Sequence, residues 1–554
     1  MADRFPKAFF IFLGALFLLN ILQSIFTQLI YDEAYYWYYS QQLDWGYFDH
    51  PPMVAFLIWL GNLLFDGELG VRFISCLLGS GTITILWLLV DNELKKKFVP
   101  HFFLLLFSMA LFNAYGFLTL PDTPLLFFTS LFLLVYKKFI TSSSFLISLL
   151  LGLVMAALMY SKYHAVLVII FVLLSNPGII KNKFAWLAVV VALLCYTPHF
   201  IWLYDHDFVS IEYHLSERPN QPYSFEGFTL GYLLNLIANF GLLFPWFYLA
   251  LFKARPKDKF KRALVFLSYG IILFFFLSSF QRRTQAQWVI VICIPMALLA
   301  YEYLLSNTNS RKWMYRLSIA STVILLYARL WLVHQPLLPI EYETHGNKEW
   351  SERLEANVGS NPVIFENSYR RAPMYAFYTG NEAFSLNNIF YRRNQYSIDD
   401  SEAKMQNRKI AYVTPYANSG DFSYTILNGQ EYYGWYIDDF ESYRKLQCFI
   451  ANGTIKLNTD KFTLQIYNPY DKSIPLSKMD LKVGYLNHYK QLKEVKPLEI
   501  DKKSNVKYLK VKDTTELRCS LVLPVDVQPE YLKFSISENG LQSAINSPSI
   551  KIKK

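Results

Sequence analysis

Apolar stretches long enough to cross a lipid bilayer recur along the first 340 residues, and they constrain the fold more than any other feature. A transmembrane helix needs about 20 mainly apolar residues, because the hydrocarbon core is about 30 Å thick. We count eleven such runs, of which the fourth and sixth are short. They lie at residues 7–30, 69–90, 98–118, 124–135, 144–159, 165–174, 184–204, 230–252, 263–280, 286–305 and 313–333. The sequence therefore predicts a mainly α-helical membrane protein with about eleven spans.

Charged residues are concentrated in the last part of the chain. Only 17% of all residues are charged and 53% are hydrophobic, which excludes a disordered chain and an ordinary cytosolic enzyme. Residues 1–340 hold 24 Lys and Arg and 17 Asp and Glu, while the remaining 214 residues hold 29 and 26. Three domains are predicted: a transmembrane domain at 1–340, a small α/β domain at 341–470 and a β domain at 471–554.

Basic residues of the first part gather in alternate loops, which predicts how the chain crosses the membrane. Eighteen of the 24 lie in loops on one side: Arg4, Lys7, Lys95–Lys97, Lys137, Lys138, Lys181, Lys183, the six between Lys253 and Arg262, Arg311, Lys312 and Arg316. Lys and Arg mark the cytoplasmic side. We therefore expect a cytoplasmic N-terminus and, with an odd number of spans, a C-terminal region outside the cytoplasm. The net charge of +10 then reflects topology, and no nucleic-acid partner is predicted.

The first outer loop is rich in acidic and aromatic residues. Asp32 and Glu33 follow the first span directly, Tyr35 belongs to the aromatic band after them, and Asp49 and His50 precede two prolines. A carboxylate at the membrane surface can take a proton from an attacking hydroxyl. In the alternative interpretation, Asp32 only caps a short interfacial helix and the prolines only begin the next one. That next segment, residues 52–65, is amphipathic and predicts a helix lying along the surface.

Other outer loops also carry charged residues, including Lys and Arg residues on the side where few are expected. Asp122 lies in a Pro-Asp-Thr-Pro segment, Lys162 follows the fifth run, and Arg282 and Arg283 follow the ninth. These three basic residues could hold an anionic lipid phosphate through charge-assisted hydrogen bonds. Alternatively, their long side chains extend to the headgroups of anionic lipids.

Four motifs together are similar to a known family. The segments DEAYYW at 32–37, LDWGYFDHPP at 43–52, PDTP at 121–124 and SKYHA at 161–165 resemble membrane glycosyltransferases of the GT-C fold. The resemblance is to the bacterial branch related to aminoarabinose transferase and protein mannosyltransferases. It implies inverting transfer of a hexose or pentose from a polyprenyl phosphate, such as undecaprenyl phosphate, to a hydroxyl of a lipid, glycan or protein. The reaction would take place on the outer side of a bacterial cytoplasmic membrane.

The resemblance also implies roles for individual residues. Asp32 matches the base, with Glu33 beside it, and Asp49 and His50 stand where the family has an acidic and a basic residue near the lipid phosphate. Further matches are Arg72 and Lys162 near the phosphate and Asp122 as a second-loop acid; Arg282, Arg283 and Tyr35 complete the predicted site. Aminoarabinose transferases have Lys where this chain has His50, so donor and acceptor are not carried over.

Several alternatives stay open from the sequence. Asp49 and His50 have the ligand types for a divalent metal ion, although no cofactor is required by the pattern. A transporter or flippase of lipid-linked sugars would need similar spans and basic residues, and a non-catalytic envelope scaffold would use the outer region alone. Cys448 and Cys519 both lie in the outer region, where a disulfide between them is allowed.

Overall fold

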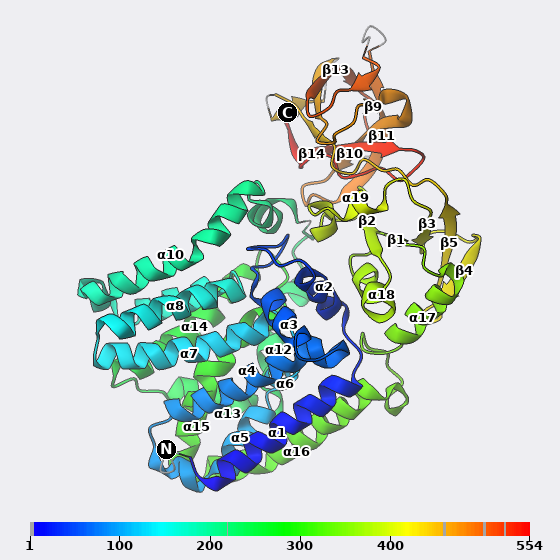
Figure 1. Cartoon of the computed structure of the whole chain (residues 1–554). Helices are drawn as coiled ribbons and strands as arrows, with labels where there is room; N and C mark the ends of the chain where they lie inside the picture. The colour runs from blue at the N-terminus through cyan, green and yellow to red at the C-terminus, as the bar shows by residue number, and fades with distance from the viewer. Residues whose placement is uncertain are drawn as a thin grey trace. The chain divides into compact units, whose positions relative to one another are not determined.

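The computed structural model describes residues 5–218, 220–451, 453–457, 461–501, 506–525 and 528–553. Arg4, one of the residues in the charge pattern, lies outside them. The chain divides into two compact units: Met1–Asp207 with Tyr223–His345, and Phe208–Pro222 with Gly346–Lys554. The first unit is a bundle of helices, and the second contains the β-sheets (Figure 1).

Long apolar helices build the first unit. Within the described residues, seven are long and apolar enough to cross a membrane. They are α1 (Lys7–Phe26), α4 (Gly67–Leu89), α7 (Asp122–Thr141), α10 (Lys183–Asp205), α14 (Lys259–Ser278), the continuous η6 and α15 (Ala286–Ser306) and α16 (Thr308–Val333). Shorter apolar helices are α3 (Met53–Asn62), α8 (Phe145–Ser161) and α9 (Ala165–Leu174). The predicted helical membrane fold is confirmed, whereas the number of spans stays a prediction.

Two predicted runs are interrupted. The run at 98–118 forms two short helices, α5 (Val99–Phe107) and α6 (Ala110–Ala114). The run at 230–252 forms α12 (Gly231–Ala238) and α13 (Phe244–Lys253), and the two halves meet at 95°. Gly241 at this break has a φ of +53°, a conformation that glycine adopts without steric cost and that cannot continue a right-handed helix.

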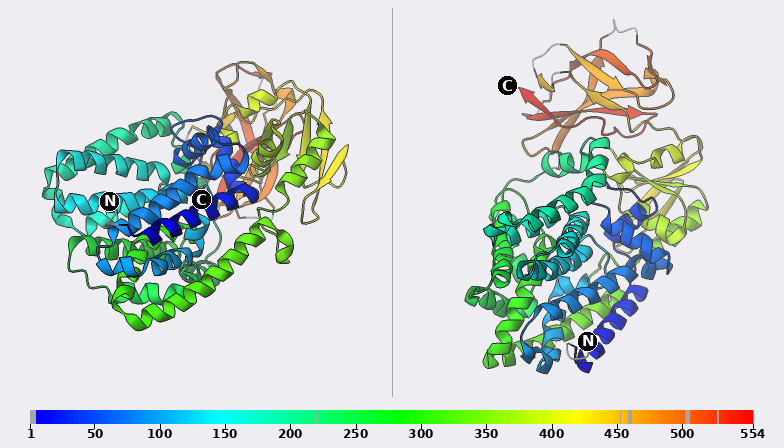
Figure 2. Two further views of the ribbon diagram at one scale, coloured as in Figure 1. Left: turned by 60° about the horizontal axis from the view of Figure 1, so that its bottom comes forward. Right: turned by 60° about the vertical axis from the view of Figure 1, so that its left-hand side comes forward.

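Helices pack side by side in the bundle, including the first and the last of them. α8 lies between α7 and α10, and α1 lies beside α16 (Figure 2). At one end of the bundle, Lys137 pairs with Asp91 at 2.6 Å and Lys261 pairs with Glu302 at 2.8 Å. The loops with the basic excess therefore meet at one end, as alternate loops should. Which side of a membrane this end faces remains a prediction.

A five-stranded sheet forms one part of the second unit. Its order is β2-β1-β3-β5-β4, with β1 (Val363–Glu366) parallel to both β2 (Ala383–Leu386) and β3 (Ile410–Thr414). β5 (Glu431–Ile437) and β4 (Phe422–Thr425) add antiparallel strands. Every residue of β1 and β3 is buried, as expected for strands covered on both faces. The helices of this part are α17 (Asn347–Val358), α18 (Arg371–Thr379) and α19 (Ser401–Met405).

An eight-stranded sheet forms the other part, in the order β6-β8-β13-β11-β10-β14-β15-β7. Its strands are β6 (Gln447–Phe449), β7 (Thr454–Lys456), β8 (Phe462–Tyr467), β10 (Met479–Leu486), β11 (Leu492–Ile500), β13 (Thr514–Leu521), β14 (Tyr531–Glu538) and β15 (Ile550–Lys553). β9 (Ile474–Pro475) and β12 (Tyr508–Leu509) form a separate pair. Three strands of the large sheet precede residue 471. The division of this unit remains a proposal, with its boundary better placed near residue 446.

A segment within the predicted transmembrane domain belongs to the second unit. Residues 208–222 contain α11 (Val209–Glu212) and η3 (Tyr213–Glu217). Glu217 forms an ion pair with Lys533 at 2.9 Å and accepts a hydrogen bond from the Ser549 backbone N–H at 3.1 Å. The predicted domain at 1–340 is therefore interrupted by a segment that packs with the C-terminal strands.

The disulfide between Cys448 and Cys519 is absent, because both residues are free and buried. Cys448 lies on β6 and Cys519 on β13, and both strands pair with β8 between them. Two strands separated by a third are roughly 10 Å apart, which exceeds the reach of a disulfide. Burial raises the pKa of the Cys519 thiol to about 12, so this side chain is a packing residue.

Candidate functional site

The first outer loop begins with α2 (Tyr31–Ser40), which presents the two predicted catalytic acids in its first turn. Carboxylates are favoured there by the partial positive charge at a helix N-terminus. Glu33 accepts a hydrogen bond from the Ile30 backbone N–H at 3.2 Å and is fully buried. Asp32 is half-buried. The two neighbouring acids therefore occupy different environments.

Glu33 and Arg72 form a buried ion pair that joins several elements. A guanidinium has five N–H donors. Arg72 makes two hydrogen bonds to Glu33, at 2.8 and 2.5 Å, and three to the backbone oxygens of Ser24, Thr27 and Gln28. The Thr119 backbone N–H also donates to Glu33, at 2.9 Å. This geometry favours a structural role for both side chains over the predicted roles in catalysis and phosphate binding.

Asp49 is held by the aromatic side chains of α2. The Tyr39 hydroxyl donates a hydrogen bond to Asp49 Oδ1 at 2.7 Å, and the Tyr39 and Tyr47 rings stack with centroids 4.2 Å apart. Burial raises the pKa of Tyr39 and the Asp49 carboxylate raises it further, so Tyr39 remains a donor. The Tyr35 ring packs on the Tyr39 ring, with centroids 4.6 Å apart. The His50 and Tyr36 rings pack in a T-shaped arrangement with centroids 5.4 Å apart. The loop is therefore a packed structure around Asp49.

The same loop is anchored to α10. The Trp202 indole N–H donates to Asp44 Oδ2 at 2.8 Å, and His199 Nδ1 lies 2.7 Å from the Trp45 carbonyl oxygen. Gly46 lies against the Trp202 ring, where an added Cβ would be only 2.3 Å from the nearest ring carbon. A side chain at position 46 cannot fit unless the loop moves.

Replacing Gly46 by Ala should therefore displace this loop and lower the free energy of unfolding by about 1–3 kcal/mol, the range for overpacked sites. Thermal unfolding of the purified protein in detergent measures this effect. Gly14→Ala is the matched control, because an added Cβ at Gly14 has no atom within 4 Å. Equal melting temperatures for Gly46→Ala and Gly14→Ala would contradict the packing described here.

Asp122 and Lys162 form a second buried ion pair. Lys162 Nζ donates to both carboxylate oxygens of Asp122, at 2.7 and 2.9 Å. Asp122 begins α7, and Lys162 follows the last residue of α8. Asp122 lies three residues after Thr119, whose backbone N–H donates a hydrogen bond to Glu33, the neighbour of Asp32. Asp32 and the Asp122–Lys162 pair therefore share one end of the bundle.

Arg282 and Arg283 lie in the loop between α14 and η6. Asn235 Nδ2 of α12 holds this loop by donating to the Thr284 carbonyl at 3.0 Å. Trp288 lies just beyond the loop and packs against His164, with the two ring centroids 5.5 Å apart. The loop of the two arginines is thereby connected to the segment that carries Lys162. Its role in phosphate binding remains a proposal.

Within the part of the chain that it describes, the structure adds no third ligand to Asp49 and His50, the two residues with the ligand types for a divalent metal ion. Among the described residues, no group of three or more His, Cys, Asp and Glu side chains is placed to hold a metal ion. Asp49 already accepts the Tyr39 hydroxyl, and the His50 ring packs against Tyr36.

One buried cation, Arg329 of α16, is missing from the predicted site. Arg329 Nε donates to Asn113 Oδ1 at 2.8 Å and Nη2 donates to Asn20 Oδ1 at 2.9 Å. Its guanidinium also lies 4.7 Å from the centre of the Phe117 ring. An arginine inside an apolar run could have been identified from the sequence, because a charged residue in a membrane span is energetically costly and usually faces the bundle interior with a partner.

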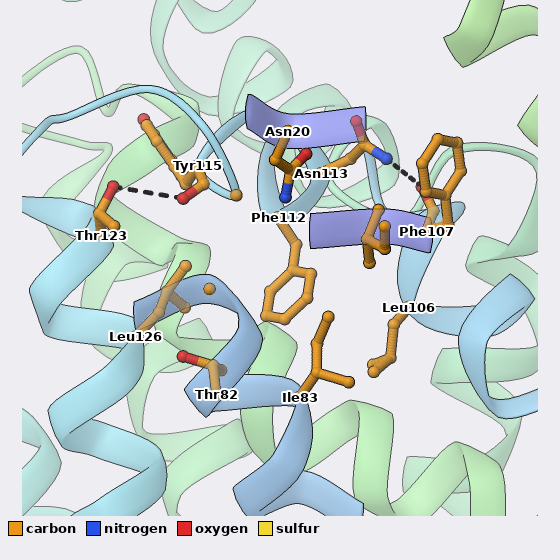
Figure 3. Close-up of a pocket in the computed structure, with 13 residues that line it drawn as sticks. Asn20, Thr82, Ile83, Leu106, Phe107, Phe112, Asn113, Tyr115, Thr123 and Leu126 are labelled. Atoms are coloured by element: carbon orange, nitrogen blue, oxygen red, sulfur yellow. Dashed lines mark hydrogen bonds between the residues drawn. The ribbon is translucent and has the colours of Figure 1, made fainter. Parts of the chain in front are cut away.

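A cavity of about 30 Å³ lies beside Asn20 and Asn113, among α1, α4, α5, α6 and α7 (Figure 3). Thr82, Phe112 and Leu126 also line it. This volume holds about two water molecules and is far too small for a sugar. This cavity therefore cannot itself hold the sugar of the proposed substrate.

Comparison with known proteins agrees with this arrangement. Residues 49–202 match the family described as dolichyl-phosphate-mannose-protein mannosyltransferase. The structure is similar to ArnT from Cupriavidus metallidurans in the apo state, with a TM-score of 0.54 and 15% identity over 73% of this chain and 92% of ArnT. For ArnT bound to undecaprenyl phosphate, the TM-score is 0.56 with 13% identity over 76% and 97% of the two chains. The chain therefore has the ArnT-like GT-C fold of a multi-pass membrane protein, and the predicted resemblance is confirmed.

A relative in sequence is the lipid A galacturonosyltransferase RgtD of Rhizobium johnstonii. The two chains are 28% identical over 302 residues, which is 50% of this chain and 60% of RgtD. The match thus spans less than two thirds of that relative.

Proposed function

We propose that this protein is a membrane glycosyltransferase that moves a sugar from a polyprenyl phosphate to a hydroxyl acceptor. The observation that carries the proposal is the placement of the half-buried Asp32 at the bundle end that also holds the Asp122–Lys162 pair. The ArnT-like fold supports it, since one of the similar ArnT structures contains undecaprenyl phosphate. The similarity to a galacturonosyltransferase supports the same class of reaction.

In the proposed reaction, Asp32 is the general base. Its carboxylate takes the proton of the acceptor hydroxyl while that oxygen attacks the anomeric carbon in line with the leaving group. A new carbon–oxygen bond forms, the bond to the phosphate breaks, and polyprenyl phosphate leaves with the electron pair. A single displacement inverts the anomeric configuration and needs one carboxylate as base.

Asp32 is a better candidate for the base than Glu33. Glu33 is fully buried and accepts hydrogen bonds from Arg72, Ile30 and Thr119. A carboxylate stabilised in this way holds the surrounding elements together and is shielded from a substrate hydroxyl. Asp32 is half-buried on the same turn of α2, so its carboxylate retains access to solvent.

The phosphate of the donor needs cations. We assign this role to Lys162, Arg282 and Arg283, with His50 as a hydrogen-bonding partner. The Lys162 charge is balanced by Asp122 in the structure, so phosphate binding there would redistribute an existing ion pair. The negative charge on the phosphate increases as its bond to the sugar breaks, so its contacts with these cations are strongest at that stage.

The proposed location is the bacterial cytoplasmic membrane, with the N-terminus in the cytoplasm and the second unit outside. The concentration of Lys and Arg at the opposite end of the bundle from Asp32 supports this orientation. The acceptor is a lipid, a glycan or a protein.

Mass spectrometry tests the proposal. The purified protein is incubated with the polyprenyl-linked sugar that copurifies with it and with extracted envelope lipids, glycans and proteins. A glycosyltransferase adds the mass of one sugar residue to an acceptor. A transporter or flippase moves the same lipid across vesicle membranes without changing the mass of any compound, and that result would contradict the proposal.

A further inference from the structure

The three parallel strands of the second unit end at one edge of their sheet. β1 lies between β2 and β3: the chain passes from β1 to β2 on one side and then crosses back over β1 to β3 on the other, so the strand order reverses beside β1. Ligands of open α/β sheets bind outside the carboxyl ends of the strands where the strand order reverses in this way. The residues that follow β1, β2 and β3 therefore occupy the position at which such sheets bind ligands.

Aromatic and basic residues follow these strands. Tyr369, Arg370 and Arg371 follow β1; Tyr391, Arg392 and Arg393 follow β2; Tyr416 follows β3. We refer to these seven residues as the Arg–Tyr edge. All seven are half-exposed or exposed. Two segments with the same Tyr-Arg-Arg sequence are thus brought to one edge by the topology, although 22 positions separate them in the chain.

Contacts among these side chains order the Arg–Tyr edge. The Arg392 guanidinium lies 4.3 Å from the centre of the Tyr369 ring and donates a hydrogen bond to the Tyr213 hydroxyl at 2.5 Å. The Tyr369 and Tyr391 rings have centroids 6.2 Å apart. The charges of Arg392 and Arg370 act to lower the pKa of Tyr391 while burial raises it, which places both cations close to this ring.

A buried polar network fixes the two Tyr-Arg-Arg segments relative to each other. Asn388, after β2, donates its backbone N–H to Asn367 Oδ1 at 2.9 Å and its side-chain amide to Glu366 Oε1 at 2.8 Å. Asn367 has a φ of +54°, the left-handed conformation that Asn tolerates better than most residues. Glu366 is a negative charge beneath the edge, but it is buried and bound by Asn388, whereas four Arg side chains reach the surface.

We propose that the Arg–Tyr edge binds an anionic sugar, one that carries a phosphate or a carboxylate group. Arginine side chains bind both groups through paired N–H donors, and tyrosine rings supply flat apolar faces with a polar tip for the sugar ring. This site consists of residues of the second unit alone. It goes beyond the proposed transfer reaction and does not depend on it.

Binding of three related sugars tests this site. Glucose 6-phosphate, glucuronate and glucose share one ring and differ only at carbon 6, which carries a phosphate ester, is a carboxylate, or carries a hydroxyl group. Isothermal titration of the full-length protein in detergent should show that at least one anionic sugar binds about tenfold more tightly than glucose. Raising the salt concentration should weaken that binding, because exposed charges are screened.

Variants connect the binding to the Arg–Tyr edge. The double variant Arg370→Gln and Arg392→Gln should weaken anionic sugar binding by about tenfold or more. Arg392→Lys should give an intermediate loss, because Lys keeps the charge but not the planar stacking group. Arg353→Gln, on the exposed surface of α17, is the control and should bind like the unmodified protein. Thermal unfolding of each variant shows whether it is folded.

Two results would overturn the inference. In one, glucose binds as tightly as both anionic sugars. In the other, a folded Arg370→Gln and Arg392→Gln variant binds as well as the Arg353→Gln control. Because sugar binding and sugar transfer are measured separately, failure of this site leaves the proposed transferase activity to its own test.

Discussion

Replacing Asp32 by Asn should lower the rate of sugar transfer by about 10²- to 10⁴-fold, the contribution expected of a positioned general base. Asn has nearly the shape of Asp but cannot accept the proton of the acceptor hydroxyl. The variant should fold and insert into membranes normally, because Asp32 is half-buried and the surrounding elements are held by Glu33 instead. Turnover is measured by mass spectrometry of the acceptor.

Asp66→Asn is the matched control for this experiment. Asp66 precedes α4, is exposed, and makes no side-chain hydrogen bond to the start of that helix. The same chemical change at this position should leave turnover unaltered. Full activity of Asp32→Asn, or an equal loss in Asp66→Asn, would refute Asp32 as the base.

Breaking the buried Glu33–Arg72 pair should have the largest effect on stability. Removal of one partner leaves an uncompensated charge in the protein interior, which costs about 3–5 kcal/mol. Both side chains are fully buried, so water cannot replace the missing partner. We expect Glu33→Leu and Arg72→Met each to lower the melting temperature strongly, and the double variant to lose less stability than the sum of the two single losses.

An exposed ion pair provides the comparison. Glu93 pairs with Lys96 at 2.7 Å, but the Glu93 side chain is 81% exposed, and surface pairs contribute little. Glu93→Gln should leave the melting temperature unchanged. If Glu33→Leu melted at the temperature of the unmodified protein, the pair would not hold α1, α2 and α4 together as the geometry indicates.

The sequence predicted those features that depend on one continuous segment. Whether a segment can span a bilayer depends on its own length and polarity, so each predicted apolar run contains a helix or a pair of helices. The first-loop motif similarly predicted a short helix after residue 30, which the structure has as α2. The break at Gly241 is also local, although the hydrophobicity of the flanking residues concealed it.

Pairings between distant residues were not predictable in the same way. Asp32 and Glu33 are adjacent and chemically alike, and the sequence predicted both of them as catalytic acids. In the structure Glu33 is buried in an ion pair with Arg72, 39 positions away in the sequence, whereas Asp32 is half-buried. The sequence allowed a disulfide between Cys448 and Cys519, but β8 lies between their strands, and strand order is not visible in the spacing of cysteines.

The sequence by itself determined that this chain is a helical membrane protein resembling GT-C glycosyltransferases, and it identified the loops that carry acidic and basic residues. Only the tertiary structure decided which of those residues neutralise each other, as Asp122 and Lys162 do across 40 positions, and which Tyr-Arg-Arg segments meet at a sheet edge. The physical reason is that bilayer spanning depends on the composition of one segment. Charge pairing instead depends on the few ångströms between side chains that folding brings together.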